Sequence, residues 1–236
     1  MLKFFRKIRQ GLLSENKFSR YLLYAVGEIL LVVIGILIAL QVNNWNTRRV
    51  EKQEEQKTYQ NIRRQIAEDR EALSRVKGLN NFYFGQYAIA NQIIAAKDTG
   101  KMDTLALLTM GLSQYSDFHR SGNIYETLVN SGELKLLRNA EITSRLQRLE
   151  MAYTYVNKLE DIHWAVIINE LSPELRGVIN YFNQQVVKPE QLYSVEMQNL
   201  FVESIFLTRG KDSIYNRALD EMQAIIELID EELNPK

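Results

Sequence analysis

The chain contains no cysteine, which excludes disulfide bonds, thiolate zinc sites and cysteine nucleophiles. It has only two histidines among 236 residues, too few for a histidine-rich metal site. Its 3 prolines and 11 glycines are fewer than a disordered or all-β chain of this length would carry. Because 46% of the residues are apolar, the chain still has enough material for a folded core.

The chain also has no net charge, because its 29 basic residues balance its 29 acidic residues. The charges are unevenly placed along the chain. Residues 1–45 hold six Lys and Arg against two Glu, and the remainder carries an excess of four acids. Composition therefore shows no basic face for nucleic acid, and we expect no nucleic-acid partner.

One long apolar run extends from Tyr21 to Val42. As a helix it would span about 33 Å, against a hydrocarbon core of about 30 Å, and Trp45 beyond it suits a membrane interface. The early basic residues precede the run, so the positive-inside rule places the N-terminus in the cytoplasm. A cleaved signal peptide is the alternative, but residues 38–41 supply no small-x-small cleavage site. We therefore predict an uncleaved signal anchor in a lipid bilayer.

A short amphipathic stretch, residues 2–13, precedes the anchor. Its apolar side chains alternate at helical spacing with four cations, Lys3, Arg6, Lys7 and Arg9. One interpretation is a helix lying on the anionic cytoplasmic leaflet, and the other is a set of charges that only orient the anchor.

Glu28 lies within the apolar run, where an ionised and unpaired carboxylate is costly. Beside it lies a helix face of small and apolar residues spaced by four: Gly27, Leu31, Gly35 and Ala39. Small residues let membrane helices approach closely, so we expect a homo-oligomer or another membrane protein as partner. Glu28 would then be a protonated side chain bonded across a helix interface, or, less favoured, a proton or ion site.

The rest of the chain shows helical periodicity and no convincing alternating strand. Residues 46–77 lack Gly and Pro, and a seam at 3-4 spacing follows Tyr59, Ile62, Ile66, Asp69, Leu73 and Val76. Further helices are expected over 79–97, 103–115, 122–130, 140–171 and 195–207, with a last one capped by Asp212. The sequence thus predicts an all-α protein, whose single transmembrane helix continues into an antiparallel helical bundle.

Four segments follow from these patterns. They are a cytoplasmic basic segment at 1–16, a transmembrane helix at 17–45, a helical extension at 46–77 and a periplasmic helical domain at 78–236.

Two local patterns invite a search for chemistry. Ser131-Gly132 ends a short helix, where the glycine permits positive φ, and an anion site at the following helix start is the alternative. Glu160 and His163 share a helix face at the spacing used in di-iron bundles, but such sites need two of these motifs and two further Glu. We therefore predict no metal and no cofactor. No nucleotide-binding, serine-hydrolase or metalloprotease motif occurs.

The opening of the chain resembles a Bacteroidota family of unknown function, DUF6090. The resemblance is carried by Lys3–Arg9, Ser14–Phe18, Tyr21–Ala25, Gly27-Glu28 and Val33–Trp45, and more loosely by Tyr125–Leu128 and Ser131-Gly132. It implies a single-pass inner-membrane protein of a Gram-negative cell with its domain in the periplasm. It implies no activity, ligand or catalytic residue.

The function expected from these features is a non-enzymatic interaction or scaffold protein of the cell envelope. Its anchor would assemble in the membrane, and its periplasmic domain would bind a partner. One alternative is a single-span subunit of an ion-driven envelope complex that uses Glu28, by analogy of layout alone. Another is a periplasmic ligand sensor whose ligand is unknown.

Overall fold

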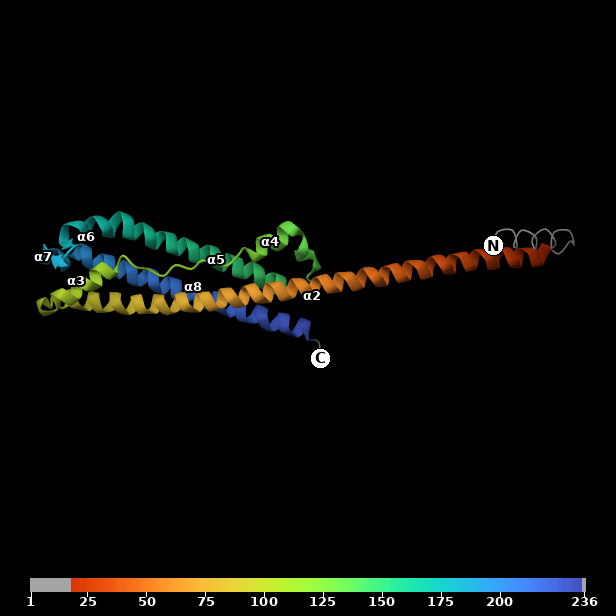
Figure 1. Cartoon of the computed structure of the whole chain (residues 1–236), viewed down its shortest axis with the longest axis horizontal. Coiled ribbons are helices and arrows are strands. Elements are labelled where there is room, and N and C mark those ends of the chain that lie inside the picture. Colours follow the sequence, from red (N-terminus) through yellow and green to blue (C-terminus); the bar gives the residue numbers. More distant parts are fainter. Residues whose placement is uncertain (1–17, 235–236) are drawn as a thin grey trace. The chain divides into compact units, whose positions relative to one another are not determined.

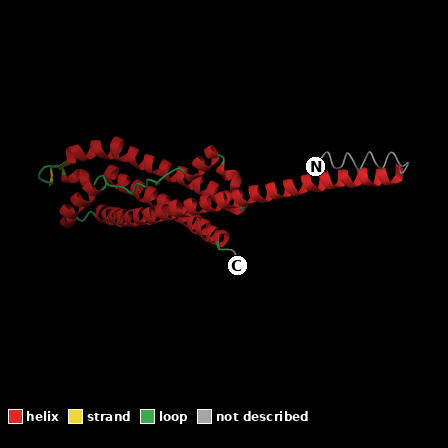
Figure 2. Ribbon diagram, turned by 45° about the vertical axis from the view of Figure 1, so that its right-hand side comes forward, coloured by secondary structure: helices red, strands yellow, loops and turns green. Residues whose placement is uncertain are grey.

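A computed structural model describes residues 18–234, and the chain divides into two units between Glu54 and Glu55. The all-α prediction is confirmed, because helices make up almost all of the described residues (Figure 2). The α-helices are α2 (Phe18–Ala95), α3 (Met102–Gly111), α4 (Ile124–Ser131), α5 (Ala140–Val166), α6 (Ser172–Val178), α7 (Pro189–Leu192) and α8 (Val195–Leu233). The 3-10 turns Thr99–Lys101 and Glu133–Leu136 and the π-helical turn Ile167–Leu171 lie between them.

The first unit contains the N-terminal part of α2. Fourteen large apolar side chains between Leu22 and Val42 are exposed along it. One helix of the described chain is thus long and apolar enough to cross a membrane, and none of its apolar window is buried.

The second unit is built around three long helices, α2, α5 and α8 (Figure 1). Contacts of Arg63 with Asp230 and of Asn80 with Thr208 show that α2 and α8 are antiparallel. Helices α5 and α8 also pack in opposite directions, whereas α2 and α5 run the same way. The chain returns between α2 and α5 through a non-helical segment, residues 112–123, which we call the strap.

Two apolar clusters form the core of this unit. One gathers the predicted seam residues with side chains of α5 and α8, including Ile66, Leu146 and Ile225. The other lies toward the opposite end and includes Tyr87, Leu171 and Phe201. The seam from Tyr59 to Leu73 is therefore buried inside this chain.

Three helix ends expected from the sequence do not occur. Helix α2 runs through Gly78 to Ala95, and α8 runs through Asp212, its N-cap being Ser194. The helix end expected at residue 171 is replaced by a π-helical turn, Ile167–Leu171, that leads directly into α6. Packing along these helices stabilises them more than a single Gly or Pro weakens them, since propensity is a weak prior.

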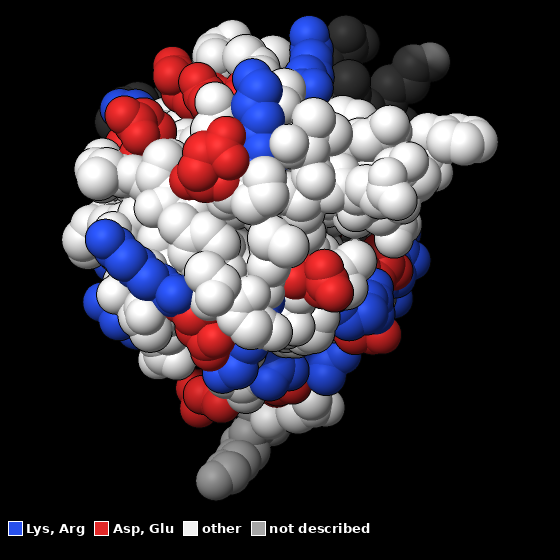
Figure 3. Space-filling model, turned by 90° about the vertical axis from the view of Figure 1, so that its left-hand side faces the viewer, with Lys and Arg blue, Asp and Glu red and all other residues white. Residues whose placement is uncertain are grey.

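A two-residue hairpin is the one strand pair in the described chain, and the sequence did not predict it. β1 (Ile179–Asn180) pairs antiparallel with β2 (Gln185–Val186). Phe182 at its turn is 97% exposed. The hairpin lies at the end of the unit that carries α6 and α7, where Figure 3 shows much uncharged surface between scattered charges.

Candidate functional site

A buried polar layer separates the two apolar clusters of the second unit. It comprises seven side chains from α2, the strap, α5 and α8, all nearly inaccessible to solvent: Asn80, Ser116, Glu160, His163, Thr208, Lys211 and Tyr215. Buried polar groups are costly unless hydrogen-bonded, so the partners of these side chains reveal what the layer does.

Most of these partners lie on the strap. Lys211 donates to the Ser116 carbonyl at 3.0 Å, and the Ser116 hydroxyl donates to Asn80 Oδ1 at 2.8 Å. The Phe118 amide donates to Glu160 Oε1 at 3.0 Å. Successive inward residues of the strap are thus fixed by side chains of three different helices. These contacts replace the ladder that an extended segment would find in a sheet.

Glu160 is the centre of the layer and is only 4% exposed. Tyr215 donates to Glu160 Oε1 at 2.6 Å, beside the bond from the Phe118 amide. Burial raises the pKa of Glu160 to about 7, against the opposing effects of these bonds and of Lys211. Burial in turn lowers the pKa of Lys211 to about 8, with Glu160 acting in the other direction.

His163 is buried among aromatic rings in the same layer. Its ring centroid lies 5.4 Å from that of Tyr115 and 6.4 Å from that of Tyr87. Neither ring nitrogen has a hydrogen-bond partner among the described residues. Burial, aided by Lys211, lowers the pKa of His163 to about 3, so the imidazole is neutral at physiological pH.

Two further buried carboxylates hold non-helical backbone in the same way. Asp69 accepts from the Ser121 amide at 2.7 Å and from the Tyr153 hydroxyl at 3.1 Å. Glu55 accepts from the Arg138 amide at 2.9 Å. All three buried acids therefore provide acceptors for backbone N–H groups outside the helices, which is a structural role.

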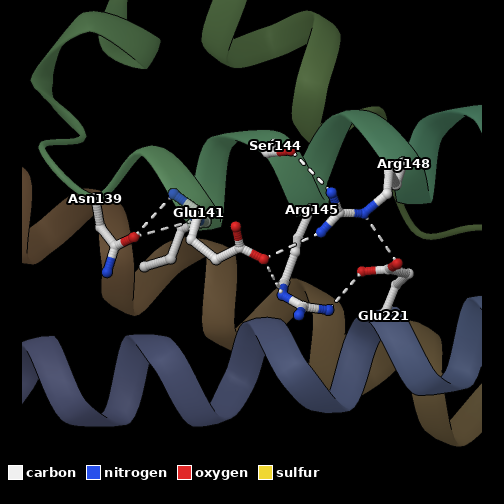
Figure 4. Close-up of polar contacts among 7 residues, drawn as sticks. Asn139, Glu141, Ser144, Arg145, Arg148 and Glu221 are labelled. Atoms are coloured by element: carbon white, nitrogen blue, oxygen red, sulfur yellow. Dashed lines mark hydrogen bonds and ion pairs between the residues drawn. The ribbon is translucent and has the colours of Figure 1, made fainter.

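An ion-pair network near the start of α5 ties this helix to α8 (Figure 4). Arg145 and Arg148 each lie 3.0 Å from a Glu221 oxygen, and Glu141 pairs with both. Asn139 caps α5, as predicted, by accepting from the Glu141 and Ile142 amides. These partly exposed pairs fix the register of the two helices and contribute little stability each.

The residues singled out by sequence are not brought together. Glu160 and His163 lie in the polar layer, whereas Ser131-Gly132 ends α4, with Gly132 at φ 76° and the Ser131 hydroxyl accepting from Glu133. Glu28 lies half-buried on α2, and the Gly27, Leu31, Gly35 and Ala39 positions are exposed. Lys3, Arg6, Lys7 and Arg9 lie outside the described residues.

Sequence reasoning missed Lys211, Tyr215 and Asp69 as members of the buried network. Asp69 gave a signal, because it interrupts an otherwise apolar seam. Lys211 and Tyr215 give none, since Lys and Tyr at these spacings are ordinary on a solvated helix. Lys211 has its partner on the strap, almost 100 residues earlier in the sequence, and Tyr215 has partners on the strap and on α5.

Two open grooves lie on the second unit. A groove of about 170 Å³ between α2 and α8 is lined by Phe84 and Arg209, among others, and reaches Asn80 and Thr208 of the polar layer. A second, of about 430 Å³, lies by the end of α2 and the start of α3. Within residues 18–234, no three His, Asp or Glu side chains gather in a way that could hold a metal ion.

The described chain is thus an all-α protein with one exposed apolar helical segment and a bundle whose buried polar groups hold its own backbone. A profile of a family of unknown function, DUF6090, matches residues 28–209. The chain belongs to this family, as the opening residues indicated. No curated protein and no solved structure matches it.

Proposed function

We propose that the chain is a membrane-anchored, non-enzymatic interaction or scaffold protein of the cell envelope. Its apolar segment would cross the inner membrane once, with the N-terminus in the cytoplasm and the second unit in the periplasm. The observation that carries this proposal is the fourteen exposed apolar side chains between Leu22 and Val42. Burying each such side chain is worth about 1.5–3 kcal/mol, so water is a poor environment for this segment and a bilayer a good one.

Self-assembly of the anchor is the second part of the proposal. A Cβ added at Gly27 or Gly35 would meet no atom within 4 Å, so this face is open to a neighbouring helix. Close approach at small residues is a common way for membrane helices to associate. Glu28, a partly buried acid, borders this face and would lie at the interface between the helices.

The second unit would bind the partner. Large apolar side chains on α5 remain exposed although the helix also packs inward: Met151, Tyr155, Ile162 and Trp164. Met151, Tyr155 and Ile162 share one side of α5 by helical spacing, whereas Trp164 and the exposed Ile168 lie on another side. Exposed apolar patches on stable domains mark interaction surfaces more often than chance would place them there.

Native mass spectrometry of the tagged full chain, extracted gently from its own membrane, tests the proposal. We expect a defined oligomer or a stable complex. Gly35→Ile should weaken association by on the order of tenfold, because a β-branched side chain prevents close approach. Val33→Ile, which adds bulk away from the small-residue face, is the matched control.

Recovery of a free monomer alone would contradict the proposal. A fixed ratio with a multi-span protein would instead favour the ion-driven complex, and Glu28→Gln would then be the next variant. That change keeps hydrogen bonding and removes titration, so an ion-driven role predicts loss of function and a scaffold role predicts none.

A further inference from the structure

The stretch of α2 that follows the apolar run carries its positive charge on one side. Trp45, Arg48, Arg49 and Lys52 are spaced i, i+3, i+4 and i+7, which places all four within an arc of about 100° on the helix. All four side chains are exposed, Trp45 at 63%. The spacing therefore produces a cationic face with an aromatic ring at the end nearer the apolar run.

The acids of this stretch lie elsewhere on the helix. Glu51 and Glu54 are more than about 100° from the middle of the cationic arc by helical spacing. Glu55 lies nearer the arc, but its side chain is buried and accepts a hydrogen bond from the Arg138 amide. The segment thus has almost no net charge but a strongly unequal distribution of charge around its axis. A count of residues, which balances the acids against the bases, hides this face.

One contact within the face brings a cation to the ring. The Arg49 guanidinium carbon lies 5.8 Å from the centroid of the Trp45 ring, a cation–π contact. Along the helix axis, Trp45 lies about 4.5 Å beyond Val42, and Arg49 lies about 10 Å beyond Val42. The headgroup layer of one leaflet is about 5–8 Å thick. The arginine backbones thus lie just outside the headgroup layer, and their long side chains can extend back to the headgroup phosphates while the helix spans the hydrocarbon.

This inference rests on the proposed membrane span. We propose that Trp45, Arg48, Arg49 and Lys52 form a binding face for the phosphate of an anionic lipid headgroup in the leaflet at the Val42 end of the span. Guanidinium groups bind phosphate oxygens in a forked geometry, and tryptophan prefers the membrane interface. A soluble phosphate offers the same charge, but it lacks the acyl chains that would place it beside Val42.

The expected preference follows from the charges. A cation near an anionic surface is worth roughly a fivefold change in affinity. Lys52 lies about 15 Å of helix beyond Val42 and contributes less than the two arginines, so we expect on the order of a five- to tenfold preference for anionic over zwitterionic lipid. Screening shortens the range of this attraction from about 8 Å at 0.15 M salt to about 3 Å at 1 M. The preference should therefore fall markedly at high salt.

Trp45 itself provides the assay. The chain has two tryptophans, so Trp164→Phe leaves Trp45 as the sole emitter. The full chain is reconstituted in phosphatidylcholine bilayers containing increasing fractions of brominated phosphatidylglycerol or, in parallel, brominated phosphatidylcholine. We expect stronger quenching per brominated phosphatidylglycerol than per brominated phosphatidylcholine.

Charge variants identify the face. Combined Arg48→Gln, Arg49→Gln and Lys52→Gln should equalise the two quenching curves. Combined Arg64→Gln, Arg70→Gln and Arg75→Gln, the same loss of charge on the same helix, should leave the preference intact.

The remaining outcomes separate this inference from the span on which it rests. Equal quenching by both lipids in the unmodified face would overturn the headgroup site alone. Absence of quenching by either lipid would contradict the membrane span. Loss of the preference on addition of 50 mM inorganic phosphate, but not of equal ionic strength as chloride, would show a site for soluble anions and overturn the assignment to lipid.

Discussion

Replacing Glu160 by glutamine is expected to change how the stability of the second unit depends on pH. Burial raises the pKa of Glu160 from 4.5 to about 7, so the folded chain binds this proton more tightly than the unfolded chain. The stabilisation by the bound proton is therefore fully present below about pH 4.5 and is lost as the pH rises through 7. Glutamine stays neutral at every pH and still accepts the bonds from Phe118 and Tyr215.

The size of the effect follows from linkage. A separation of 2.5 pH units between 4.5 and about 7 corresponds to about 3 kcal/mol, with the presence of Lys211 making this an upper value. We expect the free energy of unfolding of Glu160→Gln, relative to the unsubstituted chain, to rise by about 2–3 kcal/mol between pH 4.5 and pH 8. The titration of His163 largely cancels in the difference, because Glu160 is not among the groups that shift its pKa. Lys211 loses the attraction of Glu160 in the variant, so its pKa is lowered further and its titration stays in the difference.

The assay is guanidinium unfolding of the full chain in mild detergent at several pH values. Circular dichroism and Trp164 emission, in a Trp45→Phe background, should give coincident transitions. Asp161→Asn removes an exposed carboxylate one residue away and serves as the control, with a curve parallel to that of the unsubstituted chain. Parallel curves for Glu160→Gln as well would refute the reasoning, because they would mean that Glu160 releases its proton equally readily in both states.

Three further predictions concern the polar network and the backbone. Asp69→Ala should lower the free energy of unfolding by about 2–4 kcal/mol, because the Tyr153 hydroxyl and the Ser121 amide lose their acceptor. Denaturant titration of this variant beside Asp69→Asn measures the loss. The His163→Phe variant should gain stability relative to the unsubstituted chain as the pH falls from 6.5 towards 3, because the buried imidazole has a lowered pKa and resists protonation. Acid-induced melting followed by circular dichroism measures this gain. Absence of the gain would mean that His163 is protonated freely in the folded chain. Gly132→Ala should lower stability by about 1–2 kcal/mol because φ is 76°, whereas Gly85→Ala, in an open helical position, should raise it by about 0.5–1 kcal/mol; equal effects in thermal melts would contradict the assigned φ.

The helical character of the chain could be predicted because it depends on local periodicity. The apolar run from Tyr21 to Val42 and the seam from Tyr59 to Leu73 both appear in the structure, on α2. The caps at Asn139 and Gly132 could also be predicted, since the chemistry of a helix end lies within a few residues.

The continuity of the helices could not be predicted in the same way. Gly78 and Asp212 are ordinary signals for a helix end or start, yet α2 and α8 continue through both. Asn80, two residues after Gly78, contacts the Thr208 carbonyl, and Lys211, just before Asp212, contacts the strap. Long-range packing of this kind is invisible in a window of the sequence.

The candidate site was only half accessible to sequence reasoning. Glu160 and His163 were found through a motif typical of metal sites, but in the structure Glu160 binds backbone and His163 packs against rings. The reason is the strap, which lies against α5 and brings amide groups to Glu160. The one Ser-Gly turn signal of the strap, Ser121-Gly122, lies at its end, and the residues before it offer no pattern from which such a position could be predicted.

The backbone path of the strap is fixed largely by side chains from other parts of the chain. The side chains that accept its amide protons or donate to its carbonyls lie on α2, α5 and α8, while the side chains of Asp117 and His119 point outward and form an exposed pair at 3.2 Å. A substitution at Asp117 or His119 changes a surface, whereas a substitution at Asp69 or Glu160 releases a segment that is distant in sequence. Substitutions could therefore accumulate at the outward-facing residues of the strap. The chemistry of this surface can then change while side chains of the helices keep the strap backbone in place.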